Sequence, residues 1–149
     1  MGKIVVAFIA AVLVGHVVGA VFFTQFNLGA LIELGAPIDF AIRARTTVQD
    51  ILGMFPIYTI AVSISLLVAF SIAALIVKRL PQLRYLGFIS AGFAGFYAMH
   101  GLIEAAAGVN LYWIAKTSMG ILFQAVAGAI AGYVFAKIRD KQLQEPTDG

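Results

Sequence analysis

The sequence predicts an all-α, polytopic membrane protein built as a four-transmembrane-helix bundle, on the evidence of its composition, its long apolar stretches and its sparse charges. Of 149 residues, 62% are hydrophobic and 11% are charged, too few polar groups to cover a soluble globule. Four apolar stretches have the length of about 20 residues that crosses a hydrocarbon core of about 30 Å. They are residues 4–23, 57–77, 86–109 and 117–136. They contain no Lys, Arg or Asp, and Glu104 is their only acidic residue.

The chain is expected to form a single membrane domain over residues 1–149. The first stretch could be taken for a signal peptide, but we expect it to be retained as a spanning helix. Residues 137–149 are expected to form a short tail.

The positions of the cations predict the orientation of the chain. They gather mainly on one side of the spans, which carries Lys3, Lys78, Arg79, Arg84, Lys137, Arg139 and Lys141, whereas the other side carries Arg43, Arg45 and Lys116. Cytoplasmic loops hold the excess of Lys and Arg, so we expect a multi-pass protein of the plasma (inner) membrane with both termini in the cytoplasm. This topology accounts for the net charge of +3, and no nucleic-acid partner is expected.

The longest connection, residues 24–56, is expected on the outer side and partly helical. Thr47 and Asp50 fit a capping box, and the apolar residues after them recur at helical spacing, which predicts a short amphipathic helix beginning near Thr47. Gly35 and Pro37 divide the connection into two parts. The segment suits a lid on the bundle or in the headgroup layer, or else a gate or a partner surface.

Glycines predict close contacts between helices. Gly15 and Gly19 in the first span, and Gly128 and Gly132 in the fourth, are four residues apart, a spacing that lets helix backbones approach one another. Gly120 continues the face of the fourth span. These residues predict tight packing, either within the bundle or between copies of it.

Three polar side chains share one depth in the predicted bundle. His16, His100 and Gln124 each lie about 2.5 residues, or roughly 4 Å along a helix, outward of the centre of their stretch. The second span contributes Thr59 and Ser63 to the same half of the membrane. This pattern predicts a polar layer inside the outer half of the bundle.

The third span carries Tyr97, His100 and Glu104 at positions i, i+3 and i+7, which lie on one helical face. Glu104 lies about 10 Å outward of the centre of its span. It is therefore expected either as a headgroup-level carboxylate near Lys116 or, if it faces the bundle, as a member of the polar layer.

The layer admits three interpretations. As a structural feature, it supplies hydrogen bonds that hold the helices together, worth about 0.6 kcal/mol each on average in bilayers. As an ion or proton path, the imidazoles and Glu104 relay charge toward the outer face, although the inner half offers no matching acid or base and a complete path needs an oligomer. As a cofactor site, His16 and His100 ligate haem b from two helices, or join Glu104 around a divalent metal.

No catalytic motif is present, and the chain has no cysteine, so an enzyme is not expected. The leading interpretation is an oligomeric transport or ion-permeation protein, or a subunit of a membrane complex, in contact with the lipid bilayer and with further copies or a partner. The alternatives are a bis-histidine haem or metal-binding redox subunit and a purely structural or assembly protein.

Overall fold

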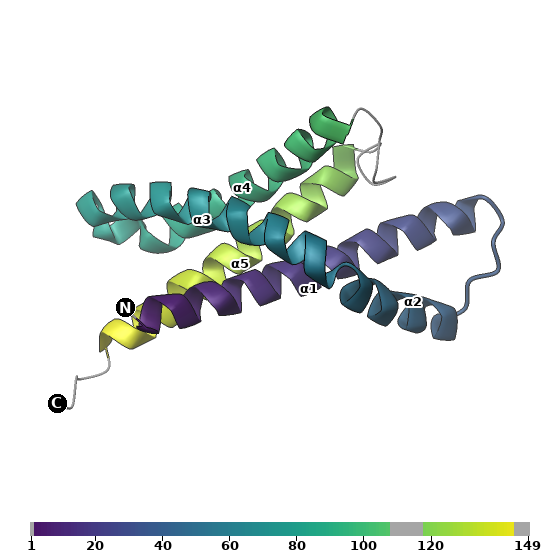
Figure 1. Ribbon diagram of the computed structural model, residues 1–149, viewed down its shortest axis with the longest axis horizontal. Coiled ribbons are helices and arrows are strands. Elements are labelled where there is room, and N and C mark those ends of the chain that lie inside the picture. The colour runs from purple at the N-terminus through teal and green to yellow at the C-terminus, as the bar shows by residue number, and fades with distance from the viewer. Residues whose placement is uncertain (1, 108–117, 145–149) are drawn as a thin grey trace.

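The computed structural model describes residues 2–107 and 118–144, and this part of the chain is helical apart from short connections. Its elements are α1 (Gly2–Glu33), α2 (Phe40–Gly53), α3 (Phe55–Arg79), the 3-10 turn η1 (Pro81–Leu83), α4 (Arg84–Ala107) and α5 (Ser118–Gln144). Helix α5 packs on both α4 and α1, and α3 packs on α4 (Figure 1). The start of α1 and the last turns of α5 lie at one end of the bundle, opposite the tip of the α1–α2 hairpin.

Four helices in the described part are long and apolar enough to cross a membrane, which confirms the predicted fold class. They run over Gly2–Glu33, Phe55–Arg79, Pro81–Ile103 and Met119–Lys141. The predicted tail is helical as far as Gln144 because α5 continues beyond its apolar stretch. Residues 108–109 and 117 of the predicted spans lie outside the described residues.

Helix α1 continues past the first apolar stretch to Glu33, so it takes up part of the connection expected over residues 24–56. Helix α2 takes up most of the remainder, and α3 begins at Phe55. The connection is thus an antiparallel helical hairpin with a short turn at its tip, more regular than predicted.

Gly35 ends α1 in a Schellman motif. Its φ of +88° is a left-handed conformation that glycine adopts without steric cost. The Gly35 N–H donates to the Ile32 carbonyl at 2.9 Å, and the Ala36 N–H donates to the Leu31 carbonyl at 3.0 Å. Pro37 follows and cannot extend the helix, so the chain turns back toward the bundle.

Helix α2 begins earlier than predicted. Asp39 is its N-cap, and the Asp39 Oδ1 accepts the Ile42 N–H at 2.8 Å. Thr47 lies in the middle of the helix, where its hydroxyl donates to the Arg43 carbonyl at 2.8 Å. The capping box predicted at Thr47 and Asp50 is therefore wrong, because a threonine bonded within its own helix does not cap a helix start.

Glycines bring the backbones of α4 and α5 into contact. A Cβ on Gly92 would collide with the carbonyl oxygen of Gly128, and a Cβ on Gly128 would collide with that of Gly92. One turn further, a Cβ on Gly132 would collide with the Phe88 carbonyl oxygen. The small-residue spacing on α5 thus lies at a contact within the bundle.

The α1 glycines also face neighbouring helices. A Cβ on Gly15 would lie 3.0 Å from the ring of Phe96, and a Cβ on Gly19 would collide with the Tyr58 hydroxyl. Gly120 is buried on α5.

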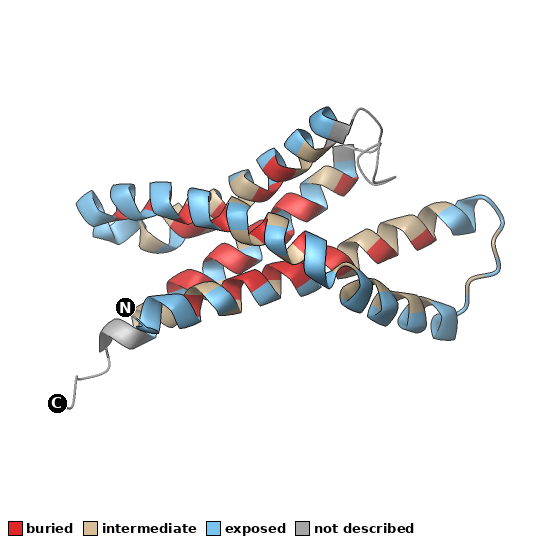
Figure 2. Ribbon diagram, viewed as in Figure 1, coloured by how far each residue is buried: buried red, intermediate tan, exposed pale blue. Residues whose placement is uncertain are grey.

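Aromatic rings fill the half of the bundle nearest the chain's N-terminus. Phe70 of α3 stacks on Phe135 of α5 with centroids 4.6 Å apart, and Phe88 of α4 meets both rings edge-on. Phe8 of α1 adds an edge contact to Phe70 at 6.5 Å. Figure 2 shows buried residues along the facing sides of these helices. Each of the four long helices thus contributes a ring to a hydrocarbon core.

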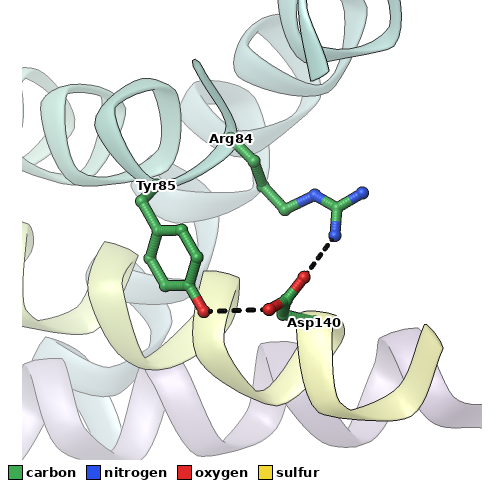
Figure 3. Close-up of polar contacts among 3 residues, drawn as sticks. All are labelled: Arg84, Tyr85 and Asp140. Atoms are coloured by element: carbon green, nitrogen blue, oxygen red, sulfur yellow. Dashed lines mark hydrogen bonds and ion pairs between the residues drawn. The ribbon is translucent and has the colours of Figure 1, made fainter. Parts of the chain in front are cut away.

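At the same end, an ion pair joins the start of α4 to the end of α5 (Figure 3). The Arg84 Nη1 donates to the Asp140 Oδ1 at 2.8 Å, and the Tyr85 hydroxyl donates to the Asp140 Oδ2 at 3.2 Å. Because both charged side chains are about 30% exposed, their pairing contributes little free energy and mainly fixes position.

Candidate functional site

His16 of α1 is fully buried and bonded through both ring nitrogens. The His16 Nε2 lies 2.9 Å from the Ile51 carbonyl oxygen; because a carbonyl only accepts, Nε2 carries the proton. The Nδ1 of the neutral ring then accepts the Thr59 hydroxyl proton at 3.1 Å. Phe55 and Tyr58 pack around the imidazole with ring centroids 5.2 and 5.6 Å away. One side chain thereby joins α1 to the end of α2 and to the start of α3.

Gln124 of α5 makes the second cross-helix junction. The Tyr58 hydroxyl donates to the Gln124 Oε1 at 3.0 Å, and the Gln124 Nε2 donates to the Gly19 carbonyl at 3.0 Å. Gln124 is 2% exposed, so these bonds replace those that water would otherwise make. We call His16, Tyr58, Thr59 and Gln124 the polar layer, because together they connect α1, α2, α3 and α5.

A row of polar contacts continues from the polar layer along the α1–α2 hairpin. Thr24 is fully buried, and its hydroxyl lies 2.8 Å from the Oδ2 of Asp50. Asp50 immediately precedes Ile51 in the chain. The Gln25 amide donates to the Thr47 hydroxyl at 3.0 Å and accepts from the Arg43 guanidinium. We call Thr24, Gln25, Arg43, Thr47 and Asp50 the hairpin seam. It holds α2 against α1 with side-chain hydrogen bonds.

The two α4 residues predicted to join the polar layer, His100 and Tyr97, make no hydrogen bond to it in the described part of the chain. His100 is half-buried, and its Nδ1 donates to the Phe96 carbonyl of its own helix at 2.9 Å. Its ring meets the Tyr58 ring edge-on at 6.1 Å, so it borders the polar layer by contact only. Tyr97 is 56% exposed, so it lies at the surface of the bundle although it shares a helical face with His100.

Ser63 also bonds within its own helix, to the Thr59 carbonyl at 2.7 Å. The second span therefore supplies the expected Thr59 to the layer, together with Tyr58, whereas the expected Ser63 lies one turn further along α3. Glu104 lies in α4, but its side chain is outside the described residues, as is Lys116.

The arrangement does not fit bis-histidine haem ligation. Nε2 of His16 carries the proton that it donates to Ile51, and Nδ1 is bonded to Thr59, so neither nitrogen is free to ligate an iron. The Tyr58 ring contacts both imidazoles, at 5.6 Å from His16 and 6.1 Å from His100. Within residues 2–107 and 118–144, excluding side chains too uncertain to describe, no three His, Cys, Asp or Glu side chains gather as a metal site would require.

Sequence reasoning missed Tyr58 and the hairpin seam. Tyr58 lies at the end of an apolar stretch, where a tyrosine is typical of a membrane interface. Thr24 and Gln25 looked like loop residues because the apolar stretch ends at residue 23, and Arg43 precedes the predicted start of the short helix at Thr47. A signal was available: Gly35 followed by Pro37 is a helix stop, which would have placed the end of α1 near Glu33.

Comparisons with known proteins give no family assignment. The sequence matches no family model, and neither the curated proteins nor the solved structures yield a significant match. The chain is thus a small membrane protein whose function has to be argued from its own geometry.

Proposed function

We propose that this chain is a non-catalytic subunit of a membrane assembly formed with further copies of itself, in which the polar layer and the hairpin seam hold the α1–α2 hairpin in a fixed position. It corresponds to the alternative of a structural or assembly protein that the sequence allows. In this proposal the buried His16 is a positioning residue.

The observation that carries the proposal is an exposed apolar ridge on α2. Phe40, Val48 and Leu52 are 84%, 57% and 68% exposed and recur at multiples of four residues, which places them along one side of the helix. At about 100° of rotation per residue, Val48 and Leu52 each lie about 100° or more around the helix from Arg43, Thr47 and Asp50, the seam residues of α2 that bind α1. An apolar row on a helix fixed in this way is typical of a contact surface. A second copy offers the same ridge, as a two-fold interface requires.

Ion permeation through a single bundle has less support. Four phenylalanine rings fill the half of the bundle nearest the N-terminus: Phe8, Phe70, Phe88 and Phe135. The hydrogen-bonding groups of the polar layer bond to neighbouring helices. A path would have to run between copies. Flux through liposomes containing the chain is therefore expected to match that of empty liposomes.

Cysteine cross-linking in membranes tests the assembly. Because the chain has no cysteine, a cysteine introduced by substitution is its only thiol. We expect Val48→Cys and Leu52→Cys to form a disulfide-linked dimer readily on mild oxidation. Gln49→Cys, exposed on the neighbouring side of α2, is the matched control and should react slowly. Light scattering should give a particle mass of at least two chains of 15.9 kDa. Equal reaction at positions 48 and 49, together with a lone chain by light scattering, would refute the proposal.

A further inference from the structure

We propose that the groove between α3 and α4 binds one anionic glycerophospholipid, with an acyl chain lying in the groove and the phosphate at Lys78 and Arg79. This inference is independent of the assembly proposed above, which uses α2. The occupant follows from the shape of the groove and from the charges at its end.

The groove has a volume of about 710 Å³ and is lined by both helices. On α4 it runs from Gly87 to Ile103, about 24 Å at the helical rise, which is most of the thickness of a bilayer core. Small residues of α4, such as Ala94 and Ala98, form one wall. A narrow apolar channel along the membrane normal suits an extended hydrocarbon chain.

The wall of the groove is mostly hydrocarbon, and its two polar lining residues are Ser65 and Ser90. The Ser65 Oγ is buried and has no hydrogen-bond partner in the described part of the chain, and it lies 3.0 Å from where a Cβ of Gly95 would stand. It therefore faces the α3–α4 contact and is withdrawn from the open groove. A lipid tail meets an apolar surface there.

The basic residues lie where the headgroup would be. A second hollow, at the end of α3, is lined by Lys78 and Arg79 and shares Ile76 with the groove. Both cations are exposed, and no ion pair is found for either within residues 2–107 and 118–144. Basic pockets at the ends of transmembrane helices are typical sites for anionic headgroups.

Several other cations at this end have contacts elsewhere. Arg84 pairs with Asp140, Lys137 lies over the Tyr133 ring at 5.6 Å, and Arg139 lies over the Phe135 ring at 5.9 Å. Lys78 and Arg79 line the hollow at the end of the groove, and their charge is the complement that a phosphate requires.

Native mass spectrometry of the full chain, titrated with dioleoyl phosphatidylglycerol or dioleoyl phosphatidylcholine, tests the proposal. We expect one tightly held phosphatidylglycerol and much weaker binding of phosphatidylcholine. Each cation near the headgroups should account for about a fivefold change in affinity. The variant Lys78→Gln/Arg79→Gln should therefore bind phosphatidylglycerol about 25-fold more weakly. The variant Lys137→Gln/Lys141→Gln removes the same charge at the same end and should change binding little.

Filling the groove tests the acyl-chain position separately. Ala94→Leu/Ala98→Leu should abolish tight binding of phosphatidylglycerol, whereas Ala74→Leu/Ala105→Leu, at exposed positions outside the groove, should retain it. Equal binding of the two lipids by the wild type, or equal losses in the paired variants, would overturn the proposal. A groove covered by a second copy would also overturn it, and would appear as a dimer that excludes lipid until Ala94 and Ala98 are replaced.

Discussion

The imidazole of His16 donates from Nε2 to the backbone carbonyl of Ile51 at 2.9 Å, so a fully buried side chain of α1 holds the last turn of α2. The end of a helix leaves carbonyls without partners inside the helix, and a buried carbonyl needs a donor. His16 supplies that donor. The imidazole therefore helps to fix where the α1–α2 hairpin joins the bundle.

Replacing His16 by leucine is expected to lower the free energy of unfolding by about 1–3 kcal/mol, since the Ile51 carbonyl and the Thr59 hydroxyl lose a partner at a partly buried junction. His100→Leu is the matched control. The bond of His100 lies within its own helix, so its loss should cost less than about 1 kcal/mol. Unfolding in mixed micelles, followed by circular dichroism, measures both. Equal costs in the two variants would argue against a special role for His16.

Gln124 and Tyr58 are expected to be energetically coupled. Gln124→Leu removes two cross-helix bonds, and Tyr58→Phe removes one of them. At about 0.6 kcal/mol per bond, Gln124→Leu should cost about 1 kcal/mol and Tyr58→Phe about half of that. A double-mutant cycle should return a coupling energy of about 0.6 kcal/mol. Strict additivity would mean that the bond contributes nothing in the membrane.

Gly92→Ala is expected to destabilise the bundle by about 1–3 kcal/mol, because its methyl group meets the Gly128 carbonyl and forces α4 and α5 apart. Gly101→Ala provides the control on the same helix. Nothing lies within 4 Å of the Cβ position there, so the higher helix propensity of alanine should leave stability unchanged or raise it by up to about 1 kcal/mol. The same unfolding assay compares the two. Similar effects at both positions would contradict the close α4–α5 crossing.

Asp140→Asn is expected to lower stability by less than about 1 kcal/mol, because the ion pair with Arg84 is partly exposed and the asparagine can still accept a hydrogen bond. The difference between wild type and variant should shrink further as salt is added, since ions screen exposed charges. Thermal unfolding at low and high salt measures this. A large loss that salt does not change would indicate a buried pair, contrary to the observed exposure.

The fold could be predicted from the sequence because apolar length alone determines a transmembrane helix, as residues 57–77 within α3 illustrate. The depth of His16 and Gln124 also predicted that polar side chains would meet inside the bundle. Their partners could not be predicted. Depth placed both Thr59 and Ser63 in the same half of the membrane, and it could not tell that Thr59 bonds to His16 while Ser63 bonds within its own helix.

The hairpin seam could not be predicted from the sequence for a different reason. Thr24 and Gln25 follow the apolar stretch and resemble the start of a loop, but they continue α1 because α2 returns along it with Asp50 and Thr47 as partners. Such a helix is stabilised by a contact distant in sequence, which periodicity within one segment does not reveal. Tertiary pairing here outweighs the local signal.

Amide hydrogen exchange in α2 tests most directly whether the polar layer holds the α1–α2 hairpin in place. In lipid nanodiscs, we predict that His16→Leu speeds exchange over residues 40–53 by about tenfold or more, whereas His100→Leu leaves it at the wild-type rate. Exchange in α2 that is unchanged by His16→Leu would contradict the account, because the hairpin would then be held without the imidazole.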